Sequence, residues 1–201
     1  DMAEEFNLYQ DIAGRTSGSI YIGCVGPVRT GKSTFIKNFM ELMILPGIQD
    51  PNERNRTIDE LPQSSNGKTI MTTEPKFIPN EGVEVSFADQ NGEPVRFKAK
   101  MIDCVGYMVP GAIGHMEDDE NRMVKTPWFE EEIPFVQAAE IGTRKVIAEH
   151  STVGLVITTD GTVTDIPRED YQEAERRVIE ELKTLGKPFI VLLNSANPER
   201  E

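Results

Sequence analysis

The chain has 201 residues, with 34 acidic against 21 basic side chains and a formal net charge of -13, a length that suits one domain with a buried core. The negative charge argues against nucleic-acid binding, because phosphate backbones are bound through clustered Lys and Arg side chains. Only two cysteines are present, which predicts no disulfide framework. The sequence has no apolar run of the ~20 residues that span a bilayer and no leader with a basic and then an apolar segment. These features predict a soluble intracellular protein.

The N-terminal third of the sequence predicts an arm, a strand and a helix. Residues 1–18 are polar with scattered apolar positions and form an arm ahead of the expected domain at residues 19–201. A short apolar, β-branched run at residues 20–25 predicts a buried strand. A helix is predicted from Gly31 to the Pro46-Gly47 pair, followed by a polar, irregular stretch at residues 49–76. The apolar face of this helix comprises Phe35, Ile36, Phe39, Met40 and Met43.

A β-hairpin is predicted next. Apolar and polar residues alternate at residues 83–87 and again at 95–101, and Asn91-Gly92 supplies the positive-φ positions that such turns need. A loop rich in Gly, Pro and acidic residues follows from Cys104 to Ile133; loops of this length are usually functional or indicate an unrecognised element. Within it, three glutamates beside Trp128 and Phe129 indicate either a subunit-contact surface or a small satellite core.

The C-terminal part alternates helices with apolar strands. We expect helices at residues 135–149 and 169–185, the second capped by Gly186, and buried strands at 153–159 and 189–193. Apolar strands separated by helices predict an α/β fold with a mainly parallel sheet, to which the hairpin adds one antiparallel edge strand. Because little sequence remains to cover the last strand, we expect the domain to be truncated after its fifth main strand.

The sequence GPVRTGKS at residues 26–33 matches the P-loop pattern G-x-x-x-x-G-K-[ST] between a predicted strand and a predicted helix. Glycines let main-chain N–H groups surround phosphates, and the helix N-terminus adds the positive end of its dipole. Lys32 would contact the β- and γ-phosphates and Ser33 would ligate Mg²⁺; the alternative is a glycine-rich turn with a solvated lysine. The other expected nucleotide-binding positions here are Gly26, Arg29, Thr30, Gly31 and Thr34.

A second motif, D-x-x-G, runs from Asp103 to Gly106 at the end of a predicted strand. A carboxylate there can hold magnesium through water, and the Gly106 N–H can donate to the γ-phosphate. Between the two motifs, Thr69, Thr72 and Thr73 compete for the role of a switch threonine that ligates Mg²⁺ and senses the γ-phosphate. Spacing does not choose among them, and a solvated polar loop is the alternative.

The order of these motifs resembles the translation-factor-related GTPases, which recognise guanine through N-K-x-D after the fifth strand. The corresponding residues here are Asn194, Ser195, Ala196 and Asn197, so Ser replaces the Lys and Asn replaces the Asp. A carboxylate accepts two N–H bonds from guanine, whereas an amide offers one acceptor. Leaving a buried donor unpaired costs ~1–3 kcal/mol. We therefore predict that ATP is preferred or at least accepted.

Two residues bear on the rate of hydrolysis. Tyr107 follows Gly106, where this class often carries a Gln or His that orients the attacking water. A phenol with a pKa of ~10 is a poor base, so we expect slow turnover. Arg29 lies in R-T-G-K-S, which resembles the loop of guanylate-binding-protein GTPases, whose arginine acts as a finger in cis and can contribute ~10³-fold to phosphoryl transfer. The alternative is an exposed arginine that pairs with an acidic loop.

Together, several segments resemble the stage IV sporulation protein A family of endospore-forming bacteria, over residues 7–195. The segments are QDIAGRTSGSIYIG, VRTGKSTFIKNFMEL, DELPQS, GKTIMTTEPKF, DCVGY, AAEIGTRKVIAEHSTVG, ITTDGT and VIEELKTLGKPF. The resemblance implies a Mg²⁺-dependent ATPase whose hydrolysis of ATP drives an essentially irreversible self-assembly around the forespore, in the mother-cell cytoplasm. It also implies catalytic roles for Lys32, Asp103 and the pair Thr72/Thr73, which ranks this pair above Thr69.

The resemblance further implies partners that act through regions outside this chain. These are a small amphipathic membrane-anchoring peptide and other spore-coat proteins. Two rival functions come from the same motifs. A GTPase-type switch acting on another protein is disfavoured by the altered guanine motif. A small-molecule kinase would need a lid with several arginines, and the long loop holds only Arg122.

Overall fold

The computed structural model describes residues 18–63, 74–113 and 122–200. Five strands form one sheet in the order β2-β3-β1-β6-β7. Four of them run parallel, and β2 pairs antiparallel with β3 at one edge. The predicted α/β class with a mainly parallel sheet is therefore confirmed. The strands are β1 (Ser19–Val25), β2 (Lys76–Ala88), β3 (Pro94–Asp103), β6 (Val153–Thr159) and β7 (Phe189–Asn194).

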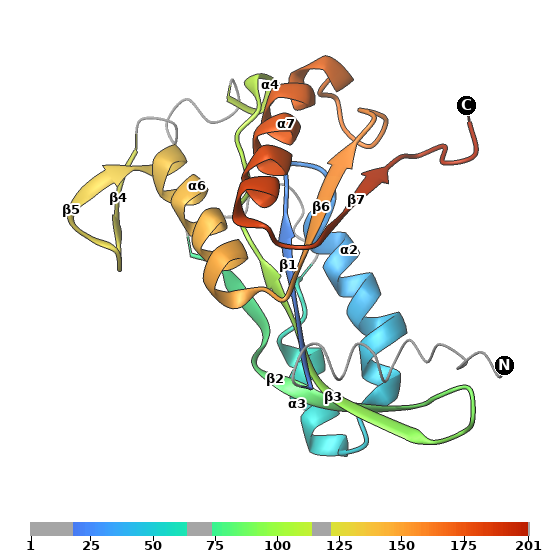
Figure 1. Cartoon of the computed structure of the whole chain (residues 1–201). Coiled ribbons are helices and arrows are strands. Elements are labelled where there is room, and N and C mark those ends of the chain that lie inside the picture. The colour runs from blue at the N-terminus through green and yellow to red at the C-terminus, as the bar shows by residue number, and fades with distance from the viewer. Residues whose placement is uncertain (1–17, 64–73, 114–121, 201) are drawn as a thin grey trace, which may run out of the picture.

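Helices lie on both faces of the sheet (Figure 1). On one face α2 (Lys32–Phe39) continues into a π-helical turn, η1 (Met40–Ile44), and a 3-10 turn, η2 (Leu45–Gly47). The other face is covered by α6 (Phe135–Lys145), which continues into a π-helical turn, η3 (Val146–His150), and by α7 (Arg168–Leu185). The sheet is therefore the middle layer of three.

Neighbouring residues of each central strand supply the two cores, because successive side chains of a strand point to opposite faces. Ile36 of α2 and Met40 of η1 pack in one core with Cys24, Met101 and Ile157. The adjacent strand residues enter the other core with side chains of α7, and those strand residues are Val25, Ile102 and Val156. Burial of each large aliphatic side chain contributes about 1.5–3 kcal/mol, so both faces of the central strands are firmly held.

The helix after the glycine-rich loop departs from the predicted face at one residue. Met43 was expected in the core but is 55% exposed, and Ile44 is buried instead. The cause is the π-helical turn η1, in which each turn contains more residues than an α-helical turn and the inward position moves along by one.

The stretch at 49–76, predicted as irregular, contains the helix α3 (Pro51–Asp59). Asp50 caps this helix by accepting a hydrogen bond from the Asn52 N–H at 2.9 Å, and Pro51 occupies its first turn. Only Thr57 of the helix is buried. The prediction was wrong because so polar a helix has no apolar periodicity, although the Asp-Pro start signal was present.

The loop predicted from Cys104 to Ile133 also contains regular structure. A short helix, α4 (Pro110–Ile113), is followed by an antiparallel hairpin of β4 (Met123–Thr126) and β5 (Phe129–Pro134). This hairpin projects away from the main sheet (Figure 1). Phe129 is exposed and belongs to neither core, so a satellite core around it is not observed in this part of the structure.

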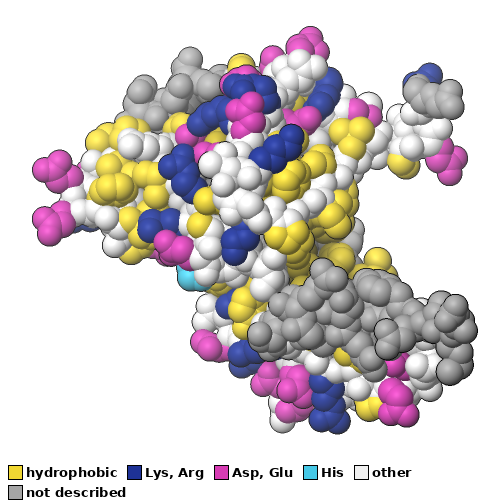
Figure 2. Space-filling view, in the orientation of Figure 1, with side chains coloured by type: hydrophobic (Ala, Val, Ile, Leu, Met, Phe, Trp, Pro, Cys, Tyr) yellow, Lys and Arg dark blue, Asp and Glu magenta, His cyan; other side chains and the backbone are white. Residues whose placement is uncertain are grey.

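The first hairpin and the last strand also differ from expectation. At the turn between β2 and β3, Gly92 has a positive φ of 80° but Asn91 does not, because the Asp89 side chain accepts from the Asn91 N–H and holds the turn. β7 was predicted as buried, yet Ile190 and Leu193 are 65% and 56% exposed. Figure 2 shows hydrophobic surface in the region where Figure 1 places β7. β7 is an edge strand, and of its residues Phe189 packs against the α7 core.

No helix in the described parts of the chain is both long enough and apolar enough to cross a lipid bilayer.

Candidate functional site

The two motifs singled out in the sequence lie side by side. β1 and β3 are parallel neighbours, with Cys24 opposite Asp103, so the loops that follow them emerge at the same edge of the sheet. The two loops are joined by main-chain hydrogen bonds. The Tyr107 N–H donates to the Gly26 carbonyl and the Val28 N–H donates to the Tyr107 carbonyl, both at 2.9 Å. The glycine-rich loop and the turn of the D-x-x-G motif therefore form one structural unit.

Three polar side chains converge where these loops meet. The Lys32 ammonium lies 3.2 Å from Asp103 Oδ1, and the Ser33 hydroxyl donates to Asp103 Oδ2 at 2.9 Å. Lys32 and Asp103 are only 10% and 16% exposed, so water screens this pair weakly. Lys32 and Ser33 open α2, and no side chain caps the N-terminus of this helix among the described residues. An ammonium group and a free helix N-terminus favour a phosphate, and the hydroxyl and carboxylate oxygens suit Mg²⁺.

Close backbone approaches fix the shape of the loops. A Cβ at Gly26 would overlap the Ile157 carbonyl oxygen, and one at Gly106 would overlap the Gly26 carbonyl oxygen. Both glycines have positive φ, 138° and 93°, which other residues rarely adopt. The D-x-x-G turn therefore contacts the glycine-rich loop without any intervening side chain.

Asn194, at the carboxyl end of β7, contacts the glycine-rich loop. Its Nδ2 donates to the Thr30 carbonyl at 2.9 Å, and a Cβ at Gly31 would lie 2.6 Å from the same nitrogen. The following Ser195 lies beside the loop after β6 instead, where its Oγ is 3.5 Å from Thr162 Oγ1. Of the two predicted positions, Asn194 supports the loop directly, and Ser195 belongs to a neighbouring cluster.

That cluster includes two residues that the sequence analysis had not singled out. Thr162 Oγ1 donates to Asp160 Oδ1 at 2.6 Å and accepts from the Ala196 N–H at 2.8 Å. Hydrogen bonds from Ser195 and from Thr162 lower the pKa of Asp160 to about 2, so its carboxylate is ionised at neutral pH. The Asp-Gly pair at residues 160–161, directly after an apolar strand, was a readable turn signal.

Arg29 is exposed and has a left-handed backbone, with φ of 57°. Such a conformation costs a residue other than glycine about 1–3 kcal/mol and persists only when its surroundings hold it. Here the buried Tyr171 of α7 supplies that support, since its hydroxyl donates to the Arg29 carbonyl at 3.2 Å and also lies 2.9 Å from Thr164 Oγ1. The helical spacing of Tyr171 indicated a core position, and its hydroxyl contacts were not foreseeable.

Tyr107 points away from the loop that its main chain contacts. Its side chain is fully buried in the core beneath α7, and its hydroxyl donates to Glu181 of α7. Burial, and then this hydrogen bond, raise the pKa of the Tyr107 hydroxyl above its ordinary value. The hydroxyl is therefore directed away from the glycine-rich loop, and the expected slow turnover stays a prediction.

The structure thus brings most of the predicted site residues to one edge of the sheet. Thr69, Thr72 and Thr73 lie outside the described residues, so their predicted role stays a prediction. The same holds for the expected arm, except for Gly18. The predicted residues that lie together are Gly26, Arg29, Thr30, Gly31, Lys32, Ser33, Thr34, Asp103, Gly106 and Asn194.

Comparison with known proteins identifies the family. Residues 3–201 match the family described as "Stage IV sporulation protein A, ATPase domain". The chain belongs to this family. It is 60% identical to stage IV sporulation protein A of Bacillus subtilis (strain 168), 57% to that of Bacillus anthracis and 56% to that of Clostridioides difficile (strain 630), each over 97% of this chain. The chain spans 39% of the length of each of these relatives.

Membership in this family confirms the resemblance drawn from the sequence segments, and it makes the chain an ATPase domain of a sporulation protein. A nucleotide is therefore the substrate of the domain. The edge at which Lys32, Ser33 and Asp103 meet is the candidate for the place where it binds.

Proposed function

We propose that this chain binds Mg²⁺-ATP between the glycine-rich loop and the D-x-x-G turn and hydrolyses it slowly. The contact of both Lys32 and Ser33 with the single carboxylate of Asp103 carries the proposal. These contacts place a cation, a hydroxyl and a carboxylate at the N-terminus of α2, which is the combination that a metal-bound triphosphate requires.

In this proposal each group of the chain has a separate task. The Lys32 ammonium neutralises charge on the β- and γ-phosphates, and the main-chain N–H groups of Thr30 to Thr34 donate to phosphate oxygens. Ser33 would ligate Mg²⁺ directly and Asp103 would hold it through water, and a bound Mg²⁺ would supply positive charge beside the phosphates. Thr72 or Thr73 completes the metal site, and Gly106 donates its N–H to the γ-phosphate.

We further propose that turnover is slow. Tyr107 stands where a water-orienting side chain is expected in related GTPases, but its hydroxyl is buried against Glu181 and is directed away from the glycine-rich loop. Arg29 is the remaining candidate to stabilise the transition state, acting as a finger in cis. Its exposed side chain and its held left-handed backbone support that role.

ATP rather than GTP is the proposed substrate. Ser195 and Asn197 replace the Lys and Asp of the guanine-recognition motif, and Ser195 Oγ accepts a hydrogen bond from the Asn197 N–H at 3.0 Å. No carboxylate is supplied by this segment to pair with the two guanine donors. The family description as an ATPase domain agrees with this preference.

At the level of the whole protein, we propose that hydrolysis drives self-assembly of a spore-coat basement layer at the forespore surface, in the mother-cell cytoplasm. The partners would be further copies of the protein, a small amphipathic membrane-anchoring peptide and other spore-coat proteins, the last two through regions outside this chain. The names of the three relatives as sporulation proteins support this setting.

The test is phosphate release from ATP and from GTP without any added acceptor, by the unmodified protein and by Lys32→Ala. We expect ATP hydrolysis that Lys32→Ala lowers about 100-fold or more, because a charge aimed at the transferred phosphoryl group is lost. Lys37→Ala, on the same helix, is the matched control and should hydrolyse normally. Undiminished hydrolysis by Lys32→Ala would refute the site. If ATP is consumed only when a second substrate is added, the protein is a kinase. Sedimentation of the protein with and without ATP tests whether ATP drives assembly.

A further inference from the structure

Tyr107 connects the D-x-x-G turn to the far side of the sheet. It directly follows Gly106, and its main chain makes hydrogen bonds in both directions with the glycine-rich loop, at Gly26 and at Val28. Its side chain lies in the core beneath α7, where the Arg177 guanidinium lies over its ring, 5.1 Å from the ring centre. The hydroxyl then donates to Glu181 on α7. One residue therefore joins both proposed phosphate-binding segments to a helix on the opposite face.

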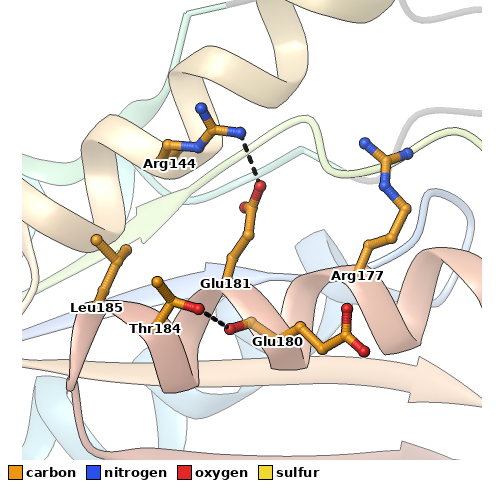
Figure 3. A pocket seen from close by; sticks show the side chains of 6 residues that line it. All are labelled: Arg144, Arg177, Glu180, Glu181, Thr184 and Leu185. Atoms are coloured by element: carbon orange, nitrogen blue, oxygen red, sulfur yellow. Dashed lines mark hydrogen bonds and ion pairs between the residues drawn. The ribbon is translucent and has the colours of Figure 1, made fainter.

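Glu181 is itself held by a second helix. One of its carboxylate oxygens accepts from Tyr107, and the other accepts from Arg144 of α6 at 2.9 Å. Figure 3 shows the Arg144 and Glu181 side chains pointing toward one another beside a surface cavity of about 430 Å³. Arg177 links the same two helices through an ion pair with Glu140 at 2.7 Å. The end of the Tyr107 side chain is therefore fixed by groups from both α6 and α7.

The turn has little freedom between these attachments. Gly106 adopts a φ of 93°, and a Cβ at this position would overlap the Gly26 carbonyl oxygen, so only glycine fits this close to the glycine-rich loop. On the side away from the glycine-rich loop, the Tyr107–Glu181 hydrogen bond ties the turn to α7. Displacing the turn by an ångström would break this hydrogen bond or one of the two main-chain bonds, because hydrogen bonds are lost beyond a donor–acceptor distance of about 3.2 Å.

We propose that Tyr107 and Glu181 are positioning residues that hold the Gly106 N–H where it meets the terminal phosphate of ATP. This inference rests on the proposed function, because it takes Gly106 as the γ-phosphate contact. Tyr107 acts through Gly106 and does not touch the nucleotide. Glu181 also pairs with Arg144 of α6. If the turn moved when the nucleotide changed, this ion pair between α6 and α7 would be the first surface contact to change.

Tyr107→Phe tests the proposal, since it keeps the buried ring and removes only the hydroxyl, while Glu181 keeps its ion pair with Arg144. We expect the affinity for a non-hydrolysable ATP analogue to fall about three- to tenfold, a fraction of what a hydrogen bond to a charged group contributes, and kcat to fall with it. The affinity for ADP should stay within about twofold of normal, because ADP lacks the phosphate that Gly106 contacts. The ratio of the two affinities is the readout.

Glu180→Gln is the matched control. Glu180 is the neighbour of Glu181 on α7 and lines the same cavity, but it pairs with Arg176 at 2.6 Å, away from Tyr107. This variant should leave the ATP-to-ADP affinity ratio unchanged. Glu181→Gln should lower the ratio less than Tyr107→Phe does, and the double variant should match Tyr107→Phe alone, because both changes act on one hydrogen bond.

Two results would overturn the inference. One is an unchanged affinity ratio and kcat in Tyr107→Phe, and the other is an equal loss of ATP and ADP affinity, which would indicate general loosening. Urea unfolding without nucleotide identifies such loosening, and Glu181→Gln gives the answer if Tyr107→Phe does not fold. If the unmodified protein binds no ATP in the presence of Mg²⁺, the proposed function itself fails.

Discussion

Replacing Gly106 with alanine tests whether the D-x-x-G turn and the glycine-rich loop form one unit. The new Cβ would overlap the Gly26 carbonyl oxygen, which is the acceptor of the Tyr107 N–H. Because this neighbour is backbone and not a flexible side chain, the two loops must move apart. We expect the hydrogen bonds from Tyr107 to Gly26 and from Val28 to Tyr107 to weaken together.

The cost has two parts. An alanine at a φ of 93° costs roughly 1–2 kcal/mol in conformational energy. The two main-chain hydrogen bonds contribute about 0.5–1.5 kcal/mol each. Their loss brings the total to about 2–5 kcal/mol of unfolding free energy. Gly186→Ala is the matched control, because Gly186 also has a positive φ, 66°, but a Cβ there would meet no atom within 4 Å. The control should show only the conformational cost.

Equilibrium unfolding in urea measures this difference, with Gly106→Ala expected to be less stable than Gly186→Ala by about 1–3 kcal/mol. ATP hydrolysis should fall about 100-fold in Gly106→Ala, as when a single transition-state donor is removed, and should be normal in the control. Equal stability of the two variants would show that the loops do not contact each other as described. Normal hydrolysis by Gly106→Ala would show that the turn does not serve the terminal phosphate.

Three further predictions concern chemistry near the site. Arg29→Ala should lower kcat for ATP about 100-fold or more with little change in ATP affinity, if Arg29 acts as a finger; steady-state hydrolysis and equilibrium binding check this, and an unchanged kcat would exclude the role. Burial raises the pKa of the Cys104 thiol to about 12, so at pH 8 iodoacetamide should label this cysteine only after unfolding. Between pH 9 and 12 the unfolded thiol, with its ordinary pKa of 9.0, releases a proton that the folded thiol keeps. The free energy of unfolding should therefore decrease as the pH rises through this range. Urea unfolding at a series of pH values measures this decrease.

The parallel strands were predictable because burial on both faces demands continuous apolar runs, and residues 153–159 became β6 with those bounds. The motif loops were predictable for a related reason, since spacing after such strands places Asp103 and Lys32 at one edge. α3 was missed because a helix with one buried residue leaves no periodic apolar pattern. The exposure of β7 was missed because an apolar run does not indicate how many helices cover a strand.

Within the site, the direction of the side chains was harder to predict from the sequence than the position of the main chain. The position of Tyr107 after Gly106 suggested a residue near the phosphates, and the main chain does lie there. Its side chain instead lies in the core beneath α7, together with Ile102 and Cys104. Continued strand alternation from Ile102 would place residue 107 on the other face, but β3 ends at Asp103 and the chain turns at Gly106, which has a positive φ. The contacts of Tyr107 with Glu181 and of Tyr171 with Arg29 join residues that are far apart in sequence. Spacing within one motif could not reveal them.

These two tyrosines bear on why a slow ATPase would suit assembly. Tyr171 holds the backbone of Arg29 and Tyr107 holds the turn at Gly106, so α7 restrains both proposed phosphate-binding segments. Restrained loops favour tight recognition of one nucleotide state, whereas fast turnover requires loops that open and close in every cycle. If each molecule hydrolyses one ATP and then remains in a polymer, rapid product release confers no advantage. A restrained site with Tyr107 at the position of the water-orienting Gln or His is therefore consistent with the proposed role of a switch that operates once in the lifetime of each molecule.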